Sequence, residues 1–138
     1  MASSTVVSRR AFVAALPFLL AAARRAPSHG HLLGEVDHPK PRPGITGDKV
    51  LSGDALEGVR EKTRRVFDMA REIPEIADGL YCYCNCEKIG HRSLLTCFES
   101  RQPIGCMGCR ESMTKAYEMH KAGKTLAEIR TALDREYR

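Results

Sequence analysis

The chain has 138 residues, a length typical of one domain, and a formal net charge of +5. Four of its 22 basic residues lie within residues 1–25, which contain no acidic residue, so the remainder carries 18 basic residues against 17 acidic ones. This nearly neutral remainder lacks the basic excess of a nucleic-acid-binding domain, and we expect no nucleic-acid partner.

The N-terminal segment has the composition of an export signal. Ser8-Arg9-Arg10-Ala11-Phe12 matches the S-R-R-x-F pattern of twin-arginine signals, and an apolar run follows as far as Ala23. That run is shorter than the ~20 apolar residues that span a bilayer, but it suits the apolar part of a signal peptide. We therefore predict a twin-arginine-like signal over residues 1–28 and export to the periplasm or cell envelope.

Two alternatives for this segment are an ordinary secretion signal and an uncleaved anchor. No cysteine lies near a cleavage site, so a lipid anchor is not indicated, and we expect membrane contact only through the signal segment. Residues 29–51 follow and are rich in proline, glycine and histidine, which predicts an extended linker.

Residues 52–138 predict a small, mainly helical domain. A first helix is expected from Asp54, where Glu57 completes a capping pattern, to about Ile73. A short helical turn is expected at residues 75–77. Thr125 and Glu128 form a capping box for a last helix. The apolar face of that helix is expected to contain Leu126, Ile129, Leu133 and Tyr137.

All six cysteines lie in the middle of this domain, at Cys82, Cys84, Cys86, Cys97, Cys106 and Cys109. The first three are two residues apart, so their side chains converge only if the backbone there is extended or turn-like. A short helix around Cys97, a break at Pro103 and Gly105, and a third helix from about Cys106 to His120, ended by Gly123, are expected to follow. A domain of this size has a thin core, which predicts stapling of the Cys-rich loop by a metal or by disulfides.

Three hypotheses compete for the cysteines. The favoured one is a metal or cluster site for Cu, Zn or Fe–S, in which all six thiols are candidate ligands and His91 is an additional candidate. The twin-arginine route exports folded proteins, which suits a cofactor loaded in the cytoplasm. This hypothesis describes a binding protein instead of an enzyme.

The second hypothesis is thiol–disulfide redox chemistry, with Cys106 and Cys109 as the catalytic C-x-x-C pair. Because Cys106 is expected at a helix start, it is predicted to be the most acidic thiol, whereas apolar burial is expected to raise the pKa of Cys97. The third hypothesis is an interaction module held by structural disulfides. A redox partner or a metal-donor protein is the partner that the first two hypotheses imply.

The order of these motifs resembles the bacterial CYCxC family, which is also described by its PCYCGC motif. The resemblance extends from about Ile73 to Tyr137 and rests on Cys82-Tyr83-Cys84-Asn85-Cys86, Gly90-His91, Cys97-Phe98 and Cys106-x-x-Cys109. Tyr81 stands where the pattern often has proline and Asn85 where it often has glycine, but asparagine tolerates a left-handed backbone. The resemblance implies an exported or lipid-anchored protein. Some members are described as selenoproteins, which implies reactive sulfur positions.

Overall fold

The computed structural model describes residues 36–137, so the predicted signal segment and residues 29–35 lie outside the described residues. All regular structure between residues 36 and 137 is helical, which confirms the mainly α fold class. No helix in this part of the chain is long and apolar enough to cross a membrane. The elements are η1 (Gly53–Leu56), α1 (Glu61–Glu72), α2 (Pro74–Asp78), η2 (Cys86–Ile89), α3 (Leu94–Phe98), α4 (Gln102–Gly105), α5 (Met107–Lys121) and α6 (Leu126–Tyr137).

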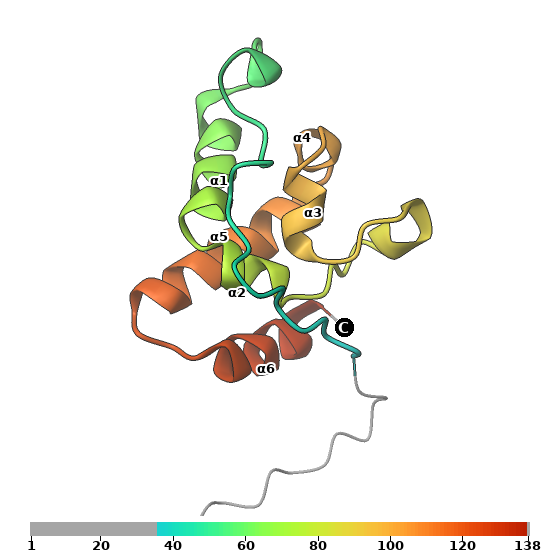
Figure 1. Ribbon diagram of the computed structural model, residues 1–138, viewed down its shortest axis with the longest axis vertical. Coiled ribbons are helices and arrows are strands. Elements are labelled where there is room, and N and C mark those ends of the chain that lie inside the picture. The colour runs from blue at the N-terminus through green and yellow to red at the C-terminus, as the bar shows by residue number, and fades with distance from the viewer. Residues whose placement is uncertain (1–35, 138) are drawn as a thin grey trace, which may run out of the picture. The chain divides into compact units, whose positions relative to one another are not determined.

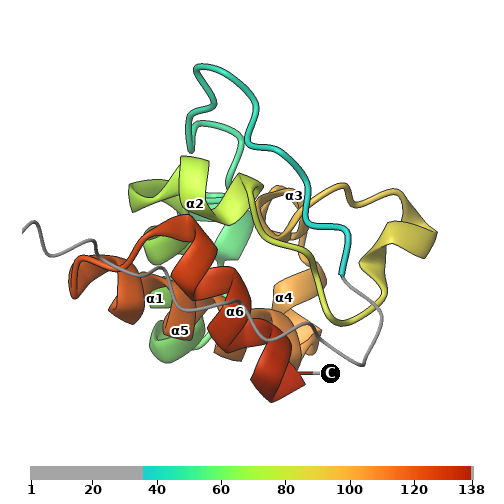
Figure 2. The same ribbon diagram turned by 90° about the horizontal axis from the view of Figure 1, so that it is seen from below.

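Helix α5 is the element on which the others assemble. It packs against α1 and α6 and also contacts the short helices α2, α3 and α4 (Figure 1, Figure 2). The rings of Phe67 in α1 and Phe98 in α3 meet edge to face, with 5.0 Å between their centroids. Both rings are fully buried, as is Met113 of α5. An apolar core therefore joins α1, α3 and α5 and fixes the relative positions of α3 and α5, from which two of the cysteines project.

The last helix has the predicted capping and apolar face. The Thr125 N–H donates to Glu128 Oε2 at 2.8 Å, and the Glu128 N–H donates to Thr125 Oγ1 at 3.3 Å. Ile129 and Leu133 are fully buried. The preceding turn contains Gly123 at φ +81°, the left-handed conformation expected after α5.

The predicted first helix is wrong at its start, because α1 begins at Glu61 and not at Asp54. Residues Gly53–Leu56 form only a 3-10 turn, and Gly58 adopts φ +73°, which a right-handed helix cannot contain. The predicted break between the helix around Cys97 and the third helix is present, at residues 99–101 and at Cys106, but Pro103 and Gly105 themselves lie in the short helix α4. Proline is tolerated there because it occupies the first turn of the helix, where the backbone N–H has no helical partner.

Residues 36–51 contain no helix or strand, as a linker would, yet they pack along the helices; we call them the N-terminal strap (Figure 1). His38 Nδ1 accepts a hydrogen bond from the Tyr81 N–H at 3.1 Å. The guanidinium of Arg130 in α6 donates to the Pro39 carbonyl at 2.8 Å. Val50 is buried in the core, so the strap is part of the folded domain.

Asp78, at the end of α2, joins the strap to α3. Its fully buried carboxylate accepts hydrogen bonds from the Arg42 N–H and guanidinium at 2.8 Å, from Arg92 at 2.8 Å and from the Ser93 hydroxyl at 2.9 Å. Burial alone would raise the pKa of Asp78, but the hydrogen bonds from Arg42 and Ser93 outweigh burial and lower the pKa from 3.8 to about 2. The ionised carboxylate is therefore the form that the fold stabilises.

We expect Asp78→Asn to lower the free energy of unfolding at pH 7 by about 2 kcal/mol. The loss is limited to this size because the Arg42 and Arg92 side chains are 37 % and 38 % exposed and keep part of their hydration. Because the folded pKa lies below the ordinary value, the carboxylate's contribution is complete above about pH 5 and is lost as pH falls through 4 towards 2. Urea unfolding between pH 2 and pH 7 measures both effects. The exposed Asp54→Asn is the matched control, and an Asp78→Asn protein with wild-type stability at pH 7 would contradict this account.

Candidate metal centre

The first three cysteines lie on a loop that is closed at its base. The Leu94 N–H donates to the Leu80 carbonyl at 2.8 Å, which joins the two ends of the loop. Within it the chain turns at residues 83–85, where Asn85 adopts φ 56°, and η2 begins at Cys86. The left-handed residue reverses the backbone direction, so Cys82 and Cys86 point the same way although four residues separate them.

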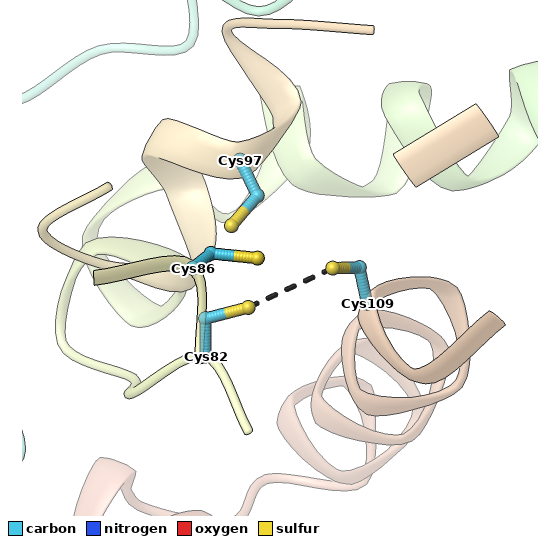
Figure 3. A group of neighbouring side chains, drawn as sticks. All are labelled: Cys82, Cys86, Cys97 and Cys109. Carbon is cyan, nitrogen blue, oxygen red and sulfur yellow. Dashed lines mark hydrogen bonds between the residues drawn. The ribbon is translucent and has the colours of Figure 1, made fainter. Parts of the chain in front are cut away.

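Four buried thiols meet beneath this loop; we call them the inner group. Cys82 and Cys86 come from the loop, Cys97 from α3 and Cys109 from α5, and their sulfurs point towards one another (Figure 3). All four sulfurs lie within 4.8 Å of one another, and the Sγ atoms of Cys82 and Cys109 are 3.6 Å apart. Three separate segments of the chain therefore deliver one compact set of sulfur donors.

Three thiols form a second set, the outer group, of Cys84, Cys106 and Cys109. The Sγ of Cys84 lies 2.9 Å from that of Cys106 and 3.7 Å from that of Cys109. Cys84 and Cys106 are half-buried, whereas Cys109 is buried. Cys109 belongs to both groups, so the six sulfurs make one continuous cluster.

The structure brings all six predicted cysteines together but divides the first three. Cys82 and Cys86 share the inner group, while Cys84, which precedes the left-handed Asn85, joins the outer group. His91 belongs to neither group. Its Nδ1 lies 3.2 Å from the Sγ of Cys97, which places the ring beside a candidate ligand and in hydrogen-bonding contact with it.

The pKa values of the thiols differ because the sulfurs share hydrogen bonds. The bonds from Cys109 and then Cys97 lower the pKa of Cys82 to about 2. Burial opposes ionisation of Cys106, but its contact with Cys84 and the nearby N–H of Cys109 lower its pKa. The pKa values of Cys82 and Cys106 are thus both lowered, which for Cys106 is the direction expected from its place at the start of a helix.

The pKa values of the remaining four thiols are raised. Burial is the main cause that raises the pKa of Cys84 to about 12 and that of Cys86 to about 11. The pKa of Cys109 is raised chiefly by its hydrogen bonds to Cys82 and Cys97. The hydrogen bond with Cys109 lowers the pKa of Cys97, but the hydrogen bond with Cys82 and burial together outweigh it, so this pKa is raised, in the direction expected from burial.

The inner group has the chemistry and spacing of a metal site. Four sulfurs bound at ~2.3 Å in a tetrahedron around one ion lie about 3.8 Å from one another. The Cys82–Cys109 separation of 3.6 Å is close to that value, and every pair is within 4.8 Å. A bound cation would take the place of the shared thiol protons, since thiolates are the form that binds metals.

Gly108 was not singled out in the sequence, although it borders the cluster. A Cβ atom at this position would lie 2.8 Å from the Sγ of Cys84, well inside van der Waals contact. The sequence does offer a signal for Gly108, since it lies between the two cysteines of the C-x-x-C pair. A residue without a side chain at that place lets another chain segment approach.

A family model described as "Protein of unknown function with PCYCGC motif" matches residues 45–138. No curated protein matches the chain, and no solved structure matches it.

Proposed function

The chain belongs to the family of proteins with the PCYCGC motif, whose description assigns no function, and we propose from the arrangement of its thiols that it binds one metal ion in the inner group. The observation that carries the proposal is the convergence of four buried sulfurs, all within 4.8 Å of one another, from three segments of the chain. Four protein ligands fill a tetrahedral ion, so the inner ion is held for structure or storage and not for catalysis.

The spacing favours a single ion over an iron–sulfur cluster. In an iron–sulfur cluster the four cysteines are divided among two or four irons, which spreads their sulfurs further apart than four ligands of one ion. The inner sulfurs lie too close together for that arrangement. An all-thiolate set suits soft or borderline ions, and Zn(II) and Cu(I) are the ions that fit it best.

His91 supports the same proposal from outside the ligand set. Residues that hydrogen-bond a metal ligand orient it and tune its basicity. An N–H at His91 Nδ1 would donate to the Cys97 thiolate over the observed 3.2 Å. This contact satisfies a sulfur lone pair that the ion does not use, and it gives the histidine a role without making it a ligand.

Elemental analysis and a count of free thiols test the proposal together. Protein from its native compartment should contain at least one equivalent of Zn or Cu, and the full count of six alkylatable cysteines should be reached only after the ion is chelated in denaturant. Protein with no metal and no free thiol would overturn the proposal. It would favour structural disulfides, with the nearest sulfur pairs, Cys84–Cys106 and Cys82–Cys109, as the first bonds to seek.

Thiol–disulfide exchange is a second candidate, and one observation favours it. The sulfurs of Cys84 and Cys106 are 2.9 Å apart, the shortest thiol contact recorded in residues 36–137. A Cys106 thiolate could attack a substrate disulfide, and Cys84 could then displace the mixed disulfide, leaving the substrate as two thiols and a Cys84–Cys106 bond. This assigns the resolving role to Cys84 instead of Cys109. Metal-free protein can be mixed with oxidised glutathione to test this candidate. Formation of the Cys84–Cys106 disulfide, and of no other disulfide, would support thiol–disulfide exchange.

A further inference from the structure

Cys84 and Cys106 have no role in a mononuclear inner site, although the sulfurs of the outer group lie as close together as those of the inner group. Cys84, Cys106 and Cys109 lie within 4.8 Å of one another, with separations of 2.9 Å and 3.7 Å from Cys84 to the other two. We propose that these three thiols bind a second, exchangeable soft metal ion, and that Cys109 bridges the two ions. This inference rests on the proposed function, because Cys109 becomes a bridge only when the inner ion is present.

Cys109 is placed for a bridging role. Its sulfur lies 3.6 Å from Cys82 on the inner side and 3.7 Å from Cys84 on the outer side. Both separations are close to the ~3.8 Å expected between two sulfurs on one tetrahedral ion. A thiolate has more than one lone pair, so the Cys109 sulfur can bind one ion on each side.

The contact between Cys84 and Cys106 is shorter than the separation of two ligands on one ion. At 2.9 Å these sulfurs share a hydrogen bond. When an ion replaces that proton, the two sulfurs must move apart by about 1 Å to reach the ~3.8 Å of a bound pair. Both side chains are half-buried and not enclosed in the core, which leaves room for that movement.

Gly108 makes the outer group possible. Its missing Cβ would lie 2.8 Å from the Cys84 sulfur, so any side chain here would displace Cys84 from its place beside α5. Gly105, three residues earlier, has no atom within 4 Å of a Cβ placed on it. Gly108 therefore leaves space for Cys84 from the loop, whereas no atom of another segment approaches Gly105 this closely.

Three donors leave one position of a tetrahedral ion open, the arrangement found where an ion must react or exchange. In the part of the chain that the structure describes, no histidine or carboxylate joins this group. The half-buried Cys84 and Cys106 also give an incoming ligand access to the ion. The outer ion is thus open to attack by a thiol of another molecule, while the inner ion is shielded by burial of all four of its ligands.

Native mass spectrometry of the reduced, metal-free full chain with Cd(II), a soft divalent probe, tests the inference. Wild-type protein should bind two Cd(II) ions, and added glutathione should remove one of them well before the other. Cys84→Ser and Gly108→Ala should each bind only one ion, whereas the matched control Gly105→Ala should bind two.

The possible failures are distinguishable. One ion on the wild-type chain at saturating Cd(II) overturns the outer site and leaves the inner one intact. Two ions on both Cys84→Ser and Gly108→Ala also overturn it, because the second ion would then lie elsewhere. No ion on the wild-type chain overturns the proposed function together with the inference.

Discussion

Cys109→Ser will weaken metal binding more than any other single cysteine substitution. Its sulfur is the one donor shared by the inner and outer groups, so its loss removes a ligand from both. Because loss of a residue that only orients a ligand already costs 10- to 100-fold in affinity, we expect the affinity for the first ion to fall by more than about 100-fold. Competition with a chromophoric chelator measures this affinity, and native mass spectrometry reports the number of ions bound.

Cys84→Ser is the matched control, because it removes a thiol from the outer group alone. It should keep wild-type affinity for the first ion and lose only the second. Circular dichroism of both variants establishes that the helices are intact. A Cys109→Ser protein that binds its first ion as tightly as the Cys84→Ser protein would show that Cys109 has no special position.

Removal of the metal should lower the thermal midpoint of the domain by about 15 °C or more. An ion that binds only the folded chain contributes about 4 kcal/mol when its free concentration is 1,000 times Kd. In a domain of this size each kcal/mol corresponds to ~4 °C or more. Scanning calorimetry of reduced protein with and without a chelator gives the shift directly.

The loss should be local before it is global. Leu80 and Leu94 are buried at the base of the loop, but between them Cys82 and Cys86 are the only buried hydrophobic side chains. Helices α1, α3 and α5, in contrast, share the core around Phe67 and Phe98. Hydrogen exchange should therefore rise first in the loop after chelation, with the Leu94 N–H as a sensitive probe. Equal protection of the loop with and without metal would rule out a structural role for the ion.

Local patterns predicted the helical parts of the fold because their causes are local. The capping box at Thr125 and the apolar spacing of α6 involve residues three or four apart, so the sequence displays them directly. The predicted start of α1 was wrong for a reason that is also visible in the sequence, because Gly58 interrupts the apparent helical pattern.

The division of the cysteines was not predictable in the same way. The spacing of Cys82, Cys84 and Cys86 indicated a shared site, but which sulfur joins which partner depends on where α3 and α5 lie after folding. The same is true of Asp78, whose partner Arg42 is 36 residues away. Such contacts leave no periodic signal in one sequence, and only the folded backbone reveals them.

The position of the N-terminal strap defines where a natively folded fragment of this protein can begin. A fragment cut at residue 52, the boundary suggested by composition, would remove His38 from the Tyr81 N–H and Arg42 from the buried carboxylate of Asp78. Both contacts flank the segment that enters the cysteine loop. Expression and labelling experiments should therefore retain residues 36–51, and tags are better joined ahead of them than in their place.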